Sequence, residues 1–235
     1  MTTLYDKVVI VTGANRGLGR EFVHQFLDRG AATVYAAARN PATITDDDPR
    51  VVPLPLDVTD PDSVARAAHA APDVDILVNN AGISTPTPVL STDTTNLRRE
   101  LDVNLFGPLA VTSTFADTLA ERSGTVVNVA SVLSWLGIGG SYSVSKAALW
   151  SATDAMRLDL APRGVHVLGL YMGYVDTDMT AGVDAPKATP ADIVGQVLDG
   201  LDTGASEVLA DDTARQVRAA LHRPVDERYA PFAAA

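Results

Sequence analysis

The sequence predicts an α/β protein with a doubly wound, mostly parallel sheet of seven strands, helices on both faces and a single domain. Seven short apolar runs alternate with helical stretches along the 235 residues. Most runs are unbroken Val, Ile, Leu and Ala, as expected for strands covered on both faces. No internal repeat or long linker divides the chain. Repeated strand–helix–strand units form right-handed crossovers, which make the sheet parallel.

The third predicted strand differs from the others because it carries Pro53 and Pro55. Proline has no amide donor for the ladder, so we expect this strand at an edge of the sheet. The predicted strands are residues 7–12, 33–38, 51–56, 74–79, 124–131, 165–171 and 207–210.

Five helices are predicted between the strands, and several have recognisable ends. Asp60 is suited to an N-cap, and Pro190 to a first turn. Gly107-Pro108 predicts a bend inside the longest helix. We expect the Ala-rich end of the chain, residues 222–235, to be a loose tail. The predicted helices are residues 18–29, 61–71, 94–122, 142–163 and 190–203.

The composition excludes several classes of protein. The chain has 18 basic and 29 acidic side chains and a net charge of −11, which argues against nucleic acid or an anionic membrane as partner. No run approaches the roughly 18 apolar residues of a membrane span, and the N-terminus runs directly into a strand pattern. The chain has no cysteine and four scattered histidines, which predict no metal site and fit a reducing cytoplasm. We therefore expect a cytoplasmic protein that binds a small molecule.

A glycine-rich turn joins the first predicted strand to the first predicted helix. Gly13, Gly17 and Gly19 permit a tight turn and a close approach of the backbone to a pyrophosphate. The helix N-terminus adds free amides and a partial positive charge. A glycine-rich turn alone is a weak signal, since any strand-to-helix connection can contain one. Here the strand before it and the helix after it favour a dinucleotide site in a Rossmann-like fold.

The end of the second predicted strand bears on the choice of nucleotide. An acidic residue there would hold the ribose 2′-hydroxyl of NAD. Instead the chain has Ala38 followed by Arg39, with Arg16 available from the glycine-rich turn. Two guanidinium groups suit a 2′-phosphate, although two solvated surface arginines remain the alternative. The sequence favours NADP(H) over NAD(H) as the cofactor.

Tyr142 and Lys146 are separated by one helical turn, so they lie on the same helix face. The chain has six tyrosines and three lysines. With this composition, such a pair arises by chance in about one chain in a dozen. Ser131 ends the fifth predicted strand and can close on the same cleft.

With these motifs in order, the chain resembles the short-chain dehydrogenase/reductase family, in its single-domain form, over almost its whole length. The resemblance implies an oxidoreductase that interconverts a ketone or aldehyde with its alcohol. It also implies a homodimer or homotetramer, with residues 94–122 and 142–163 as interfaces. A non-catalytic NADP-binding sensor or scaffold on the same fold is the alternative. The matching motifs are Thr12-Gly13-x-x-x-Gly17-x-Gly19, Asp57, Asn79-Asn80-Ala81-Gly82, Asn104, Ser131 and Tyr142-x-x-x-Lys146.

The resemblance assigns the catalytic roles by position. Ser131 is expected to hold the substrate oxygen and Tyr142 to transfer its proton. Lys146 is expected to bind the nicotinamide ribose and favour ionisation of Tyr142. Asn104 is expected to hold a water that links Lys146 to solvent, and Asp57 to bind the adenine amino group. In isolation Asn104 suits a helix cap, Ser131 a strand-end hydroxyl and Asp57 a turn. The cofactor-binding residues expected from the resemblance are Gly13, Asn15, Arg16, Gly17, Leu18, Gly19, Arg39, Asp57, Val58, Asn80, Ala81, Gly82, Tyr142, Lys146, Gly173, Val175 and Thr177.

Simple electrostatics supports the pairing of Tyr142 with Lys146. Free tyrosine titrates near pH 10 and is a poor base at neutral pH. A lysine cation about 5 Å away, at an effective dielectric constant of about 20, favours the phenolate by roughly 3 kcal/mol, or about two pKa units. We therefore expect the pKa of Tyr142 to be lowered.

Two features depart from the family pattern. Met172-Gly173 stands where Pro-Gly is usual, which puts the rigidity of that loop in question. The interval from Ser131 to Tyr142 is a residue or two short, so we expect a tighter loop there, with Ser134 as a conceivable substitute for Ser131.

The predicted cleft walls are residues 83–88, 133–140 and 174–185, which contain no lysine or arginine. They predict an uncharged, fairly apolar substrate. Core packing is the alternative for Trp135 and Leu136. The short segment between Asp178 and Pro190 predicts an open site with a broad substrate range.

Overall fold

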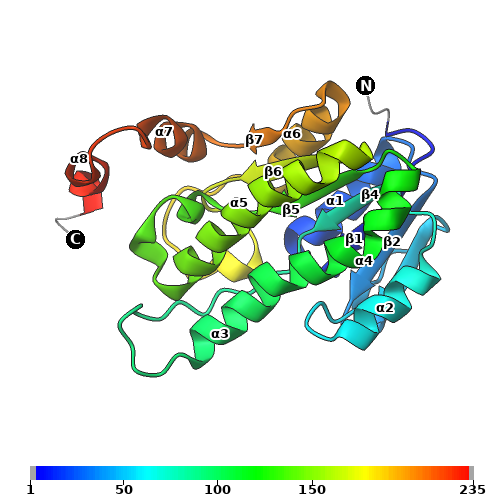
Figure 1. Cartoon of the computed structure of the whole chain (residues 1–235), viewed down its shortest axis with the longest axis horizontal. Helices are drawn as coiled ribbons and strands as arrows, with labels where there is room; N and C mark the ends of the chain where they lie inside the picture. The colour runs from blue at the N-terminus through cyan, green and yellow to red at the C-terminus, as the bar shows by residue number, and fades with distance from the viewer. Residues whose placement is uncertain (1–3, 233–235) are drawn as a thin grey trace.

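A parallel sheet of seven strands forms the centre of the molecule (Figure 1). The computed structural model describes residues 4–232. The strand order is β3-β2-β1-β4-β5-β6-β7, so all seven predicted strands are present in one Rossmann-like sheet. The strands are β1 (Val8–Thr12), β2 (Thr33–Ala38), β3 (Val51–Pro55), β4 (Ile76–Asn79), β5 (Thr125–Val129), β6 (His166–Tyr171) and β7 (Glu207–Leu209).

Successive residues of each central strand enter cores on opposite sides of the sheet. In β1, Val9 and Val11 pack into one hydrophobic cluster, whereas Ile10 packs into the other. In β4, Leu77 packs on the Ile10 side. Both faces are therefore apolar, which explains why these strands show no polar alternation in the sequence.

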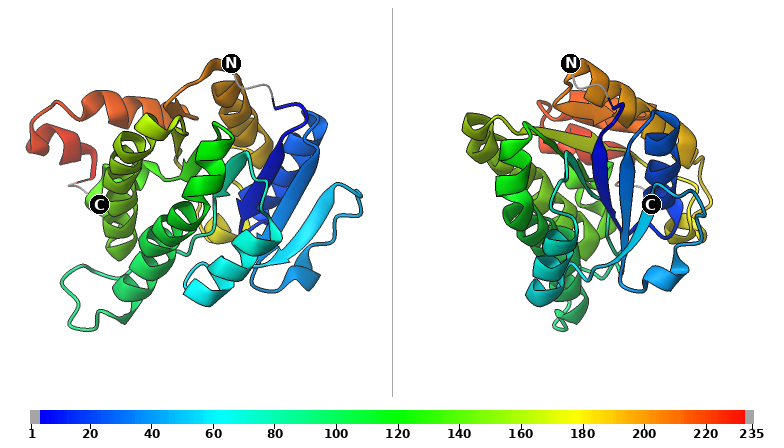
Figure 2. Two further views of the ribbon diagram at one scale, coloured as in Figure 1. Left: turned by 45° about the vertical axis from the view of Figure 1, so that its right-hand side comes forward. Right: turned by 90° about the vertical axis from the view of Figure 1, so that its right-hand side faces the viewer.

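Two layers of helices cover the sheet (Figure 2). Helices α1 (Gly17–Asp28) and α6 (Pro190–Thr203) cover one face, where Phe22, Phe26 and Ile193 are fully buried. Helices α2 (Pro61–Ala70), α4 (Gly107–Glu121) and α5 (Ser141–Leu160) cover the other. The side chain of Asp60 caps α2 through the amide of Asp62, as the sequence predicts. Over residues 4–232, no helix is both long enough and apolar enough to cross a membrane.

The sheet has one edge and one switch point that matter for the site. Strand β3, with Pro53 and Pro55, is at the edge, as predicted. Strand β1 lies between β2 and β4, so the strand order reverses there. In open α/β sheets, ligands bind outside the carboxyl ends of the strands at such a point.

The predicted long helix is broken into three parts. Helix α3 (Thr95–Leu101) leads into a π-helical turn (Asp102–Phe106), and α4 begins at Gly107. The irregularity thus ends just before Gly107-Pro108, where the sequence predicts a bend. Asn104 lies in this turn and is fully buried. Short π-helical insertions often occur at functional sites.

The C-terminal region differs from the expected loose tail. Helix α7 (Asp212–Ala220) and helix α8 (Val225–Tyr229) follow β7, and both were missed by sequence periodicity because they are short. The Tyr229 hydroxyl accepts a hydrogen bond from the Gly137 amide at 2.9 Å. This contact anchors α8 to the body of the protein. The last part of the expected tail, residues 233–235, lies outside the described residues.

Candidate active site

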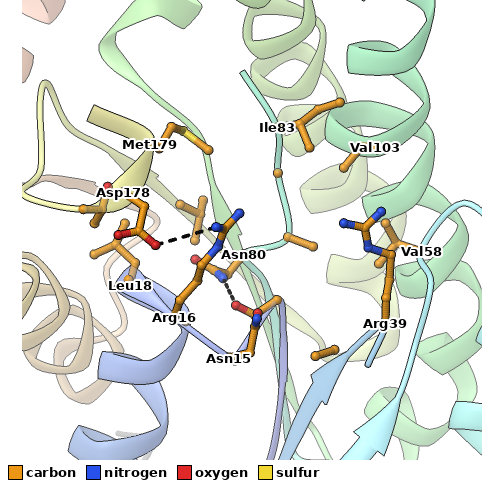
Figure 3. Close-up of a pocket in the computed structure, with 18 of the residues that line it drawn as sticks. Asn15, Arg16, Leu18, Arg39, Val58, Asn80, Ile83, Val103, Asp178 and Met179 are labelled. Atoms are coloured by element: carbon orange, nitrogen blue, oxygen red, sulfur yellow. Dashed lines mark hydrogen bonds and ion pairs between the residues drawn. The ribbon is translucent and has the colours of Figure 1, made fainter. Parts of the chain in front are cut away.

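The carboxyl ends of β1, β2, β4 and β5 open onto one cleft with a volume of about 380 Å³ (Figure 3). It lies at the switch point of the sheet. The glycine-rich turn, the segment after β4 and the Tyr142–Lys146 pair all line it. The fold thus brings the two predicted motifs, distant in sequence, to one site. The predicted residues that line it are Gly13, Asn15, Arg16, Gly17, Leu18, Gly19, Arg39, Asp57, Val58, Asn80, Ala81, Gly82, Tyr142, Lys146 and Thr177.

The glycine-rich turn has the geometry that a phosphate site requires. Gly13 adopts a φ of +67°, and a Cβ on Gly19 would lie 2.1 Å from the Gly13 carbonyl oxygen. Helix α1 begins at Gly17 with no side-chain cap and no acidic residue in its first turn. Its first amides are therefore free of the protein's own side chains and suited to a pyrophosphate.

The segment after β4 is fixed against the glycine-rich turn. The Asn80 side-chain amide donates to the carbonyl oxygens of Thr12 and Gly13, at 2.9 and 3.1 Å. The Thr12 hydroxyl accepts from the amides of Asn80 and Ala81. Behind them, Asn79 donates to Asn128 and Thr112 within the sheet and its covering helix. These contacts set the floor of the cleft before any ligand arrives.

The two predicted phosphate-binding arginines come from opposite sides of the cleft (Figure 3). Arg16 forms an ion pair with Asp178 at 3.6 Å, between two exposed side chains. Arg39 is exposed and lies near Asp57. Hydrogen bonds from Thr59, and then the charge of Arg39, lower the pKa of Asp57. Arg16 is thus paired with a carboxylate, whereas Arg39 follows the neutral Ala38 at the end of β2, where the sequence predicts the ribose end of the nucleotide.

Tyr142 and Lys146 lie on one face of α5, as predicted from their spacing. The Lys146 Nζ is 5.7 Å from the centre of the Tyr142 ring and donates to the Val129 carbonyl oxygen at 2.9 Å. Lys146 is only 4% exposed. Burial lowers its pKa to about 8, because the ammonium loses its hydration.

The expected direction of the Tyr142 pKa shift is wrong for this structure. Burial, and then the charge of Glu100, raise the pKa of Tyr142 above its ordinary value. The sequence argument included the attraction of Lys146 but neither the loss of water nor the carboxylate. Glu100 precedes Asn104 by one helical turn, and no motif marks it.

Ser131 and Ser134 have different environments. The Ser131 Oγ accepts from the Leu133 amide at 3.1 Å, which leaves its hydroxyl proton free to donate. The Ser134 hydroxyl is buried and donates to the Lys146 carbonyl oxygen at 2.9 Å. Ser134 is therefore committed to the start of α5, and the structure does not support it as a substitute for Ser131. Ser131 itself is buried at the end of β5 and does not line the cleft.

Asn104 holds the backbone rather than facing the cleft. Its Oδ1 accepts from the Ile83 amide, and its Nδ2 donates to the Ile83 carbonyl oxygen, both at 2.9 Å. The Nδ2 also donates to the Ser145 hydroxyl at 3.0 Å. Asn104 thus ties the segment after β4 to α5, and its role toward a water stays a prediction.

The loop after β6 is held despite its departure from the family pattern. The Gly173 amide donates to the Asp211 carboxylate at 2.6 Å, and the same carboxylate caps α7 through the Ala214 amide. Asp211 therefore supplies rigidity that proline would otherwise give. Thr177 lines the cleft, whereas Gly173 and Val175 do not.

The loop between Ser131 and Tyr142 is tight, as its length predicts. It forms two successive 3₁₀ turns, Val132–Ser134 and Gly137–Gly139. Gly140 then adopts a φ of +57°, and a Cβ there would lie 2.3 Å from the Thr87 carbonyl oxygen. Only glycine fits this approach between the two loops.

The predicted cleft walls are only partly correct. Trp135 and Leu136 are buried in a core cluster, where Trp135 stacks on Tyr171 at 4.5 Å. Ile83 and Met179 do line the cleft. Asp178 also lies in a predicted wall, whereas the charged lining residues Arg99 and Asp102 were not predicted, because they lie beside a motif rather than in one. The lining residues that sequence reasoning missed are Leu56, Thr59, Arg99, Asp102, Val103, Val129, Ala130 and Met172.

Comparison with known proteins places these features in a family. The sequence profile of short chain dehydrogenases matches residues 7–188. A short-chain dehydrogenase of Penicillium crustosum is 38% identical over 184 residues, which are 73% of this chain and 66% of that protein. The chain thus spans just under two thirds of that relative's length.

Solved structures agree with the sequence match. A short chain dehydrogenase of Burkholderia cenocepacia, crystallised in complex with NADP, is 36% identical with a TM-score of 0.94 over 99% of both chains. The NADPH-bound carbonyl reductase from chicken fatty liver is 26% identical with a TM-score of 0.78, over 86% of this chain and 93% of that one.

Proposed function

The chain belongs to the short-chain dehydrogenase/reductase family, and from that premise we propose that it is an NADP(H)-dependent oxidoreductase acting on a fairly apolar ketone or aldehyde and its alcohol. The observation that carries the proposal is the meeting of two features in one cleft. The uncapped N-terminus of α1 lies on one side, and Tyr142 with Lys146 lies on the other. The bound NADP of the Burkholderia neighbour supports the choice of cofactor.

Each group in the cleft then has a chemical task. The free amides of α1 hold the pyrophosphate, and Arg39 holds the 2′-phosphate through charge-assisted hydrogen bonds. When bound, NADPH supplies the hydride for reduction of the carbonyl carbon. Ser131 follows the lining residue Ala130 and has a hydroxyl proton free to donate, so a small shift of its side chain lets it hold the carbonyl oxygen that Tyr142 protonates. Lys146 binds the nicotinamide ribose.

The substrate class and the assembly follow from exposed apolar side chains. Met179, which lines the cleft, and Ile138 and Tyr174, which lie in two of the predicted cleft walls, are about half exposed and suit an apolar substrate. Phe106 of the π-helical turn and Leu158 of α5 are exposed on the helical face that we propose as a homodimer or homotetramer interface. We also place the protein in the cytoplasm, in keeping with its lack of cysteine.

The test is nucleotide consumption with NADPH and with NADH, across a panel of apolar ketones and aldehydes. We expect turnover with a preference for NADPH, and a loss of about 10³-fold in kcat for Tyr142→Phe with unchanged NADPH binding. Binding of NADPH without turnover of any carbonyl compound would favour the sensor or scaffold. Failure to bind either nucleotide would overturn the proposal.

A further inference from the structure

Residues 83–87, which we call the strap, follow β4 and pass beside helices α3 and α5. Asn104 binds both backbone groups of Ile83. The amide of Thr87 donates to the Ser141 hydroxyl at 3.0 Å, and the Ser141 amide donates to the Thr87 carbonyl oxygen at 2.9 Å. Both ends of the strap are thus tied to the helices that carry the site. Ile83 at its first residue lines the cleft.

The middle of the strap is held by Glu100. The Oε1 of this carboxylate accepts from the Thr85 amide at 2.6 Å and from the Thr85 hydroxyl at 3.3 Å. Glu100 thus anchors Thr85 in the middle of the strap, between the contacts that hold Ile83 and Thr87 at its ends. Since Thr85 donates both hydrogen bonds, the anchor needs only an acceptor oxygen, not a full negative charge.

Packing alone does not explain why an acidic residue occupies position 100. The side chain is fully buried, and its Oε2 has no hydrogen-bond partner among residues 4–232. A buried, partly unsatisfied carboxylate costs free energy that a neutral side chain of the same shape would avoid. Its charge is instead felt at the Tyr142 phenol, whose pKa it raises after burial.

Two charged groups act on Tyr142 within residues 4–232, and others lie in the same cleft or along the neighbouring helices. Glu100 comes from α3 and Lys146 from α5, while Arg99 and Asp102 line the same cleft. Arg98 of α3 is exposed and bonds to Thr94. The other titratable groups on elements packed against α5 are Asp117 and Glu121 of α4, Asp154, Arg157 and Asp159 of α5 itself, Arg163 beyond it, and His166 and Tyr171 of β6.

We propose that Glu100 is a positioning residue of this site, which fixes the strap through Thr85 and places a buried negative charge where α3 packs against α5, the helix that carries Tyr142. The inference rests on the proposed function, because it takes Tyr142 as the group that transfers the proton. The carboxylate keeps Tyr142 in its acid form to higher pH. It therefore supports reduction over a wide pH range and opposes oxidation at neutral pH.

Two substitutions separate the two tasks of Glu100. Glu100→Gln keeps an acceptor oxygen for Thr85 but removes the charge. Its KM for the carbonyl substrate should match wild type, while the alkaline limb of kcat/KM for reduction moves to lower pH by about one unit. Glu100→Ala should show the same shift and also a KM raised about 10-fold, since the strap loses its anchor. Glu121→Gln, an equal charge change at the exposed end of α4, should leave both unchanged.

The opposite results would overturn the inference. A Glu100→Gln profile superimposable on wild type would remove the electrostatic role, and an unchanged KM in Glu100→Ala would remove the positioning role. Should Glu100→Ala not fold, Glu100→Gln still decides the charge effect. Ultraviolet titration of phenolate, corrected with Tyr142→Phe, reports the Tyr142 pKa without turnover, and a pKa no lower in Glu100→Gln would refute the proposal. Failure of the proposed function looks different, because Tyr142→Phe would then be as active as wild type.

Discussion

Backbone groups form one side of the cleft, whereas buried polar side chains form the other. On the nucleotide side, the backbone of the glycine-rich turn and the uncapped end of α1 form the surface, with exposed arginines around it. On the reacting side, Lys146, Asn104 and Glu100 are buried side chains, each tied to a neighbouring element. The nucleotide side is therefore sensitive to any added side-chain atom that would displace the backbone of the glycine-rich turn. The reacting side depends instead on charges and hydrogen bonds between segments that are far apart in the chain.

The largest effect is expected where a Cβ would enter the turn. In Gly19→Ala, the new methyl group would lie 2.1 Å from the Gly13 carbonyl oxygen, so the turn must move. We expect NADPH affinity to fall by about 100-fold or more, measured by fluorescence titration.

Gly195→Ala is the matched control for Gly19→Ala. Gly195 lies in α6, where the nearest atom to a Cβ is the flexible Gln25 Oε1 at 3.6 Å. This change should leave binding intact and raise the free energy of unfolding by about 0.5–1 kcal/mol. Wild-type affinity in Gly19→Ala would show that the nucleotide does not use this turn.

Substitution of Ser131 and of Ser134 by alanine tests which hydroxyl serves the reacting side. Ser131→Ala should lower kcat/KM by about 100-fold, because the hydroxyl that we propose to orient the carbonyl oxygen is lost. Ser134→Ala should leave kcat/KM close to wild type but lower the free energy of unfolding by about 1 kcal/mol, since its hydrogen bond to Lys146 is structural. Steady-state kinetics and thermal denaturation measure both. A large loss of kcat/KM in Ser134→Ala, with little change in Ser131→Ala, would indicate that Ser134 binds the substrate instead.

Arg39→Ala probes the ribose end of the nucleotide side. Its guanidinium should contact only the 2′-phosphate, so we expect the Kd of NADPH to rise about 10-fold and that of NADH to stay constant. Arg66→Ala is the control, because Arg66 pairs with Asp60 on the outer face of α2 at 3.6 Å. An equal loss for both nucleotides in Arg39→Ala would contradict the assignment.

A pH-dependent effect on stability is expected on the reacting side. Burial lowers the pKa of Lys146 from 10.5 to about 8. Between these values the unfolded chain binds more protons than the folded one, so this group makes the free energy of unfolding rise with pH from about 8 to 10.5. The buried Lys146 ammonium therefore lowers the free energy of unfolding most strongly below pH 8. Lys146→Met should abolish turnover yet raise the free energy of unfolding at neutral pH by about 1–3 kcal/mol.

Thermal denaturation at several pH values checks this prediction. The advantage of Lys146→Met should shrink as pH rises toward 10.5, where wild-type Lys146 loses its charge in both states. A constant difference at all pH values would mean that packing, and not the buried charge, separates the two proteins.

The parts of the site that were predictable are local in sequence. The glycine-rich turn could be identified because its strand, turn and helix are contiguous, and the pairing of Tyr142 with Lys146 because four residues make one helical turn. Trp135 shows the limit of this reasoning. An apolar residue in a loop fits a cleft wall or a core equally well, and the stacking on Tyr171 is a contact between distant segments.

The succession of the seven strands along the chain, the edge position of β3, the glycine-rich turn and the face shared by Tyr142 and Lys146 could all be read from the amino-acid sequence. These features depend on periodicity and on residues a few positions apart. Three other features became visible only in the folded chain: the charge of Glu100 acts on Tyr142, Ser134 is committed to α5, and Asp211 secures the loop after β6. The physical reason is that burial and electrostatic fields depend on which distant segments pack together, and a local pattern carries no record of that packing.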